Sequence, residues 1–267
     1  MSKMRFEYIT SGENELAASV SLPPPEAATE AAPDAGGGPW PTVIVVHGLT
    51  GSRMGKSYHL VEFARKLAER GIACVRFDQA GCGESTGKFE NLTIRTMADD
   101  ARAVYEWTRA QPWCLSSRIG VTALSLGALA SLDLPDGMGL ALWAGVFDLP
   151  GVFKVTAKTG LRALLEHQGW IPYRGLRIGK RFIEQLGAIR AEEELPTGRS
   201  PLLVCHSRVD QVVPFAEAEA YSAACERLGR PCERVVFEKA THDFVDYPDR
   251  MRLLDTTVNW FAARASD

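Results

Sequence analysis

The chain has 267 residues, of which 46% are hydrophobic and 24% are charged, and its formal net charge is −3. These fractions are typical of globular proteins and exclude collagen-like, disordered and disulfide-scaffold chains. The small net charge gives no electrostatic reason to expect a nucleic-acid partner. No apolar run reaches the roughly 18 residues that span a bilayer, and the first residues contain no signal-peptide core. Six cysteines without a Cys-x-x-Cys pair favour reduced thiols, so we expect a cytoplasmic protein without a membrane span.

Short β-type runs alternate with helical-period segments along the chain. This alternation predicts an α/β fold with a mostly parallel, twisted sheet and helices on both faces. The first two runs, 6–10 and 16–22, are close enough to form a hairpin, and residues 23–41 are rich in Pro, Ala and Gly and predict a mobile loop. The other predicted elements, in chain order, are strand 43–46, helix 60–70, strand 73–78, helix 93–111, strands 118–123, 140–144 and 202–205, helix 215–228, strand 234–237 and a final amphipathic helix.

Residues 149–200 break the alternation, because they contain no convincing strand but several short apolar helical stretches. We interpret them as a small helical cap inserted into a single domain that spans residues 1–267. The nine Lys/Arg and five Glu of this segment give it a charge of +4, which leaves −7 for the rest of the chain. Such a cap could steer an anionic substrate, although a solvated helical surface explains the same composition. Its aromatic and leucine side chains are expected to pack on the body, with one or two lining an acyl pocket.

The strongest chemical signal is the run Ala123-Leu124-Ser125-Leu126-Gly127, which lies between a predicted strand and a helical run. It nearly matches the nucleophile elbow G-x-S-x-G, in which a sharp turn exposes a serine at the end of a sheet. Ala123 replaces the first glycine, which weakens the match. A serine that caps the following helix would fit the same position, so the run alone leaves both interpretations open.

A serine nucleophile needs a general base, and the base needs an acid that orients it. In elbow proteins the acid and then the histidine follow the serine along the chain, on loops past strand ends. Asp210 follows one predicted strand, and His242, the only histidine after Asp210, follows the last one. We therefore predict a triad of Ser125, Asp210 and His242. Asp243 and Asp246 are rival acids, but they lie too close to His242 on one loop for good geometry.

The tetrahedral oxyanion of acyl transfer needs two backbone N–H donors. We expect one donor from Leu126, directly after the nucleophile, and the other from Leu49, in the loop after strand 43–46. His47 ends that strand, and we interpret it as a residue that braces the loop. This chemistry requires no metal or other cofactor.

Four blocks of the sequence resemble the α/β-hydrolase superfamily and, within it, small bacterial carboxylesterases of the cinnamoyl and feruloyl esterase type. The blocks are residues 47–51, residues 75–91 with an Asp-x-x-Gly-x-Gly-x-Ser loop, the elbow, and residues 206–214 together with Thr241 and His242. The resemblance implies an α/β-hydrolase fold with Ser125 as nucleophile, Asp210 as acid and His242 as base. The cap does not match well enough to transfer any substrate-binding residue.

Two positions depart from these esterases: Leu126 stands where Gln is frequent, and Ser207 where Gly is usual. The predicted function is hydrolysis of a small-molecule ester or thioester through an acyl-enzyme. A thioesterase or acyltransferase on the same triad, a peptidase of related fold and a non-catalytic binding protein remain open alternatives. An NTPase is disfavoured, because the phosphate-loop pattern that ends at Ser57 needs a glycine at position 50, where the chain has Thr50.

Overall fold

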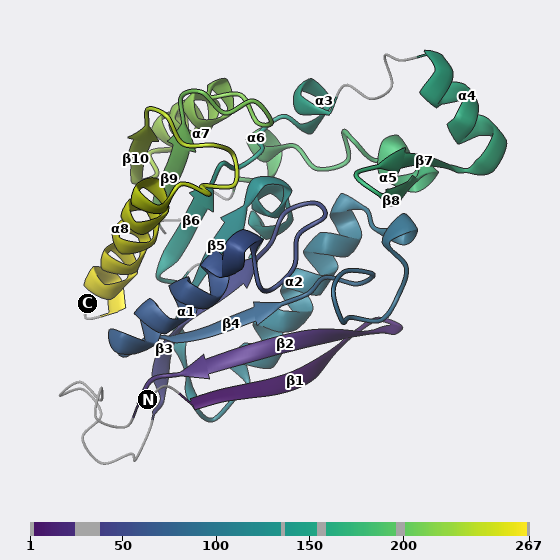
Figure 1. The fold of residues 1–267 in the computed structure, drawn as a ribbon. Helices are drawn as coiled ribbons and strands as arrows, with labels where there is room; N and C mark the ends of the chain where they lie inside the picture. The colour runs from purple at the N-terminus through teal and green to yellow at the C-terminus, as the bar shows by residue number, and fades with distance from the viewer. Residues whose placement is uncertain (1–2, 25–37, 135–136, 154–158, 196–200, 266–267) are drawn as a thin grey trace.

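The computed structural model describes residues 3–24, 38–134, 137–153, 159–195 and 201–265. In these ranges one eight-stranded sheet has the order β1-β2-β4-β3-β5-β6-β9-β10 (Figure 1). β1 and β2 form an antiparallel hairpin, β2 pairs antiparallel with β4, and all other neighbours are parallel. The strands are β1 (Lys3–Ser11), β2 (Asn14–Leu22), β3 (Trp40–Val46), β4 (Ala73–Phe77), β5 (Cys114–Leu124), β6 (Gly139–Trp143), β9 (Leu202–Ser207) and β10 (Cys232–Phe237).

Helices cover both faces of this sheet (Figure 1). α1 (His59–Glu69) and α8 (Tyr247–Ala265) pack together over one core, and α2 (Ile94–Arg109) and α7 (Ala216–Leu228) pack over the other. Successive side chains of a strand point to opposite faces, so a strand between two helical layers must be apolar throughout. On β3, Val43 and Val45 belong to the core under α1 and α8, whereas Ile44 and Val46 belong to the other core. This explains the uninterrupted apolar run that predicted the strand.

The mostly parallel sheet with helices on both faces confirms the predicted fold class. The main boundary difference is at β5, which begins at Cys114 rather than at residue 118. Its first residues include Ser116 and Ser117, which are exposed and polar, so hydrophobicity could not reveal them. The helical run after the elbow is a 3₁₀ helix, η4 (Ser125–Ser131). Of the predicted loop 23–41, residues 25–37 lie outside the described residues.

The predicted helical cap also contains strands, which corrects the expectation of a purely helical segment. β7 (Trp170–Tyr173) and β8 (Leu176–Gly179) form an antiparallel hairpin. Arg174 and Gly175 have φ values of 49° and 82°, the pair of positive values that a two-residue type I′ turn requires. Each strand has only four residues, which is too short for a recognisable alternation. The other elements of the segment are α3 (Leu149–Val152), α4 (Thr159–Gln168), α5 (Lys180–Glu184) and α6 (Ala191–Glu194).

The start of the cap is fixed by α7. Glu217 accepts hydrogen bonds from the backbone N–H groups of Phe147 and Asp148, at 2.6 and 2.7 Å. The Tyr221 hydroxyl donates to the Val146 carbonyl at 2.8 Å. These contacts hold the chain after β6 at the carboxyl end of the sheet, so the cap begins next to the strand ends that carry the predicted triad.

Candidate active site

The predicted triad residues follow three parallel strands at the carboxyl edge of the sheet, the usual place for a site in such folds. Ser125 follows β5, Asp210 follows β9 and His242 follows β10. The Ser125 Oγ lies 3.2 Å from His242 Nε2, and His242 Nδ1 lies 2.7 Å from Asp210 Oδ2. The rival acids are placed differently, because Asp243 binds Lys56 at 2.7 Å and Asp246 is exposed. The structure thus brings the three predicted residues into one hydrogen-bonded chain.

The backbone at Ser125 is strained, as a nucleophile elbow requires. Its φ is 51°, in the left-handed region that costs a residue with a side chain about 1–3 kcal/mol. Close packing holds this turn: a Cβ at Gly127 would lie 2.6 Å from the Val46 carbonyl oxygen, and one at Gly48 would lie 2.9 Å from the Ser125 Cβ. Ala123, which replaces the first glycine of the motif, is fully buried, so its methyl group is accommodated in the core.

The loop that carries Asp210 is closed by hydrogen bonds to its own backbone. Asp210 Oδ1 accepts from the N–H groups of Val212 and Val213 at 2.8 and 2.9 Å. Burial raises the pKa of Asp210, but the hydrogen bond and charge of His242 and the two backbone donors outweigh it and hold the pKa below its ordinary value. The buried His206 ring donates from Nε2 to the Val213 carbonyl at 2.9 Å and braces the same loop. Asp210 is therefore an ionised acceptor in a fixed position.

His47 organises the loop that contains Leu49. The ring is buried, which lowers its pKa, and the ring is neutral with its proton on Nδ1, because Nδ1 contacts the Gly48 carbonyl at 2.8 Å. Nε2 accepts from the Gln79 N–H at 3.1 Å. The Gly48 carbonyl also accepts from the Gly51 N–H at 3.0 Å. A peptide group is planar and trans, so fixing the Gly48 carbonyl also fixes the Leu49 N–H, which points the opposite way. These contacts agree with the interpretation of His47 as a brace.

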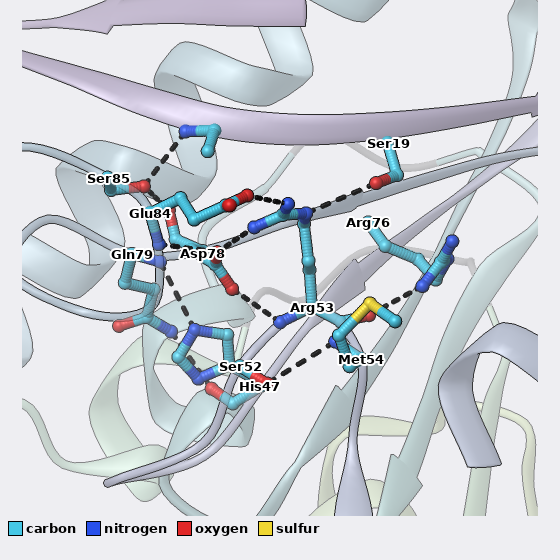
Figure 2. Close-up of polar contacts among 11 residues, drawn as sticks. Ser19, His47, Ser52, Arg53, Met54, Arg76, Asp78, Gln79, Glu84 and Ser85 are labelled. Carbon is cyan, nitrogen blue, oxygen red and sulfur yellow. Dashed lines mark hydrogen bonds and ion pairs between the residues drawn. The ribbon is translucent and has the colours of Figure 1, made fainter. Parts of the chain in front are cut away.

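A polar cluster around the buried pair Arg53 and Asp78 holds the next part of that loop to the sheet (Figure 2). The Arg53 N–H donates to Asp78 Oδ1 at 2.6 Å, and its guanidinium group binds both Asp78 and Glu84. Arg53 Nε also donates to Ser19 at 3.1 Å, and Arg76 donates to the Arg53 carbonyl at 2.7 Å. The cluster ties β2 and β4 to the loop between β3 and α1. Its role is structural, and it supports the segment that presents Leu49.

Sequence reasoning singled out the glycine-rich loop after β4 but missed Arg53. In the structure a Cβ at Gly83 would lie 2.1 Å from Asp78 Oδ2, and the Glu84 N–H donates to that oxygen at 3.0 Å. Gly83 is therefore required because the backbone at this position lies directly against the Asp78 carboxylate. The available signal was Asp78 itself, since a carboxylate at the end of a buried strand needs a cation.

A cavity of about 470 Å³ opens at Ser125, and its lining residues form two walls of different chemistry. The first, the cap wall, is mostly apolar and consists of Val146, Leu149, Val152, Phe153, Tyr173 and one cation, Arg174. The second, the α1 wall, contains polar side chains from the β3–α1 connection and from the loop after β10, and consists of Ser52, Lys56, His59 and Asp243. Of the cap's aromatic and leucine side chains that were expected to supply one or two residues of an acyl pocket, Leu149, Phe153 and Tyr173 line this cavity.

Comparisons with known proteins give one family match and several related structures. Residues 14–137 match the X-Pro dipeptidyl-peptidase (S15 family) pattern. An uncharacterized protein of Mycobacterium tuberculosis is 27% identical over 224 residues, which cover 84% of this chain and 70% of the relative. The structure of Est1E from Butyrivibrio proteoclasticus with bound ferulic acid matches with a TM-score of 0.79 and 21% identity, covering 98% of this chain and 100% of the other.

A peptidase structure is similar as well: the acylaminoacyl peptidase of Pyrococcus horikoshii matches with a TM-score of 0.71 and 18% identity, over 97% of this chain and 41% of that one. None of the helices in the described ranges has both the length and the apolar character needed to cross a membrane. The sheet order, the strained serine at the end of β5 and these matches agree on the architecture. The chain therefore has the α/β-hydrolase fold.

Proposed function

We propose that the protein is a serine hydrolase that cleaves carboxylic esters through an acyl-enzyme intermediate. The hydrogen-bonded chain from Ser125 through His242 to Asp210 carries this proposal, because it supplies a nucleophile, a base and an orienting acid in the required order. Ser125 and His242 line a cavity large enough for a small substrate. The esterases and peptidases among the similar structures support hydrolase chemistry on this fold.

In the proposed mechanism the Ser125 hydroxyl attacks the ester carbonyl while His242 Nε2 takes its proton. Asp210, which accepts from Nδ1, keeps the imidazole in the productive tautomer and stabilises the imidazolium that forms. The N–H groups of Leu49 and Leu126 bind the tetrahedral oxyanion, each contributing about 3 kcal/mol. His242 then protonates the leaving alcohol, and water repeats the sequence on the acyl-enzyme.

The cavity lining favours an ester over a peptide substrate. A peptidase that recognises a free amino terminus needs a carboxylate to pair with the ammonium group, since an unpaired charge is costly to bury. Asp243 is the one acidic side chain among the described lining residues, and it already binds Lys56 at 2.7 Å. The cap wall offers apolar side chains that suit an acyl chain. The S15 family match makes the peptidase alternative worth testing directly.

The test compares wild type with Ser125→Ala on p-nitrophenyl esters of two to eight acyl carbons, on matched thioesters and on a dipeptidyl p-nitroanilide. We expect ester turnover in the wild type and a loss of about 10⁶-fold in the variant, as for other triad serines. Ser117→Ala, at an exposed position of β5, the strand that precedes Ser125, should leave turnover and labelling by a serine-reactive phosphonate unchanged. Full activity in a folded Ser125→Ala protein would refute the proposal, and faster cleavage of the anilide or the thioester would assign the corresponding alternative.

A further inference from the structure

His59 is a second histidine at the cavity, separate from the triad. It is the first residue of α1, its side chain lines the cavity, and only 6% of its surface is exposed. The ring lies beside Trp143, with 6.1 Å between the ring centroids. The backbone of Gly55 also passes so close to the ring that a Cβ there would lie 2.8 Å from His59 Cε1. Packing therefore fixes the orientation of the ring.

One hydrogen bond defines which nitrogen of His59 carries the proton. Nδ1 lies 2.6 Å from the Lys56 carbonyl oxygen, which can only accept, so Nδ1 is protonated. Burial lowers the pKa of His59, so the ring is neutral near pH 7 and Nε2 holds a lone pair. The charges around the ring pair with one another: Lys56 with Asp243 at 2.7 Å, and Arg250 with Glu62 at 3.5 Å.

Within the described ranges Nε2 of His59 has no hydrogen-bond partner, and it is not among the buried, unpartnered side-chain atoms. Nδ1 of His206 shows the contrasting case, an unpartnered nitrogen that is sealed inside the protein. Because the His59 side chain lines the cavity, its small exposed surface opens into that space. The α1 wall thus presents a rigid, neutral acceptor to whatever the cavity binds.

We infer that His59 Nε2 accepts a hydrogen bond from a hydroxyl group of the substrate, so that the protein prefers esters that carry a hydroxyl on the part bound against the α1 wall. This inference rests on the proposed ester hydrolysis. A substrate without the hydroxyl would displace water from Nε2 and leave the acceptor unpaired, which costs about as much as one neutral hydrogen bond. The expected preference is therefore about tenfold in kcat/KM.

The experiment uses sets of three esters that differ only in one group: a hydroxyl, a methyl of similar size, or a methoxy that accepts but cannot donate. The group is placed in turn at each carbon of a short acyl chain and of a short alcohol. For at least one position, the wild type should turn over the hydroxyl ester about tenfold faster than both analogues. Equal rates within every set would overturn the inference without any variant.

Two variants then assign the preference to His59. His59→Phe keeps a ring beside Trp143 but removes the acceptor, so the hydroxyl-to-methyl ratio should fall to about one, whatever the absolute rate. His59→Gln places an amide oxygen within reach of the Nε2 position and should restore part of the ratio. His167→Phe changes an exposed histidine of the cap outside the cavity and should keep the wild-type ratio. A wild-type ratio in a folded His59→Phe protein would overturn the inference.

Failure of the proposed function has a different signature. If the wild type hydrolyses no ester, the same sets are compared as ligands by their shift of the melting temperature. A larger shift for the hydroxyl ester in wild type, absent in His59→Phe, would support recognition by His59 although the esterase proposal had failed. Equal shifts in the two proteins would overturn the recognition as well.

Discussion

The body and the cap meet at one cavity but contribute differently to it. Ser125, Asp210 and His242 each follow a strand of the body, where register with neighbouring strands fixes the backbone. The cap contributes side chains such as Phe153 and Tyr173 from short elements that have few partners in the sheet. Substitutions in the triad should therefore change the rate for every substrate, whereas substitutions in the cap should change which substrates are preferred.

Asp210→Asn gives the largest expected effect and tests whether a triad substitution lowers the rate for every substrate. Asparagine can still accept from the Val212 and Val213 N–H groups, but it favours the wrong tautomer of His242, so we expect kcat to fall about 10⁴-fold for all acyl lengths. Steady-state kinetics over an ester series measure the change. Asp246→Asn alters the exposed rival acid and should stay within twofold of wild type. A greater loss in Asp246→Asn than in Asp210→Asn would mean that the acid is misassigned.

The same difference explains what the sequence could predict. The strands of the body can be recognised in the sequence as continuous apolar runs. Ser125, Asp210 and His242 follow the ends of three of these strands in chain order. Their meeting at one edge is a property of parallel sheets, so the order and spacing were sufficient to propose the triad. The mutual distances of these side chains required the structure.

The cap and the α1 wall were less predictable for physical reasons. Ile171 and Ile178 are the only buried hydrophobic side chains of the β7–β8 hairpin, so its pattern is too short to separate from a helix. The sequence analysis did not single out His59. Its orientation depends on a backbone carbonyl, that of Lys56, and on packing against the distant Trp143, and neither contact produces a recognisable sequence motif. Arg53 was missed for the same reason, since its partner Asp78 is 25 residues away.

Acid should lower the stability of the protein through the buried histidines of the body but not through the exposed histidine of the cap. Burial lowers the pKa of His47, His59 and His206, whereas the cap's His167 is exposed. Each of these buried histidines has a lower pKa in the folded state than the value of 6.5 in the unfolded state. Its contribution to the free energy of unfolding is therefore fully present above pH 6.5 and is lost as the pH falls toward the folded-state pKa. We expect the free energy of unfolding to decrease below pH 6.5, by at most about 1.4 kcal/mol per pH unit for each histidine.

Urea unfolding at pH 7.5, 6.5 and 5.5 measures this loss. His206→Gln should make the decline shallower, because it removes one buried imidazole. His167→Ala should leave the decline as in wild type, because it removes an exposed ring rather than a buried one. A free energy of unfolding that stays constant or rises between pH 6.5 and 5.5 would contradict the assignment of three neutral, buried rings.

The smallest expected effect comes from a substitution in the cap, which tests whether the cap changes substrate preference alone. Val152 is half-buried and lines the cap wall, so Val152→Phe should fill part of the cavity without opening a hole in the core. We expect kcat/KM for an eight-carbon acyl ester to fall about tenfold, the size typical of losing a few methylene contacts, while the acetate ester stays within twofold. Leu164→Phe, at an exposed position of α4 outside the cavity lining, is the matched control and should leave both esters unchanged. An equal loss for acetate and octanoate in Val152→Phe would show that the cap sets the rate of the chemistry as well, and the division between the triad and the cap would not hold.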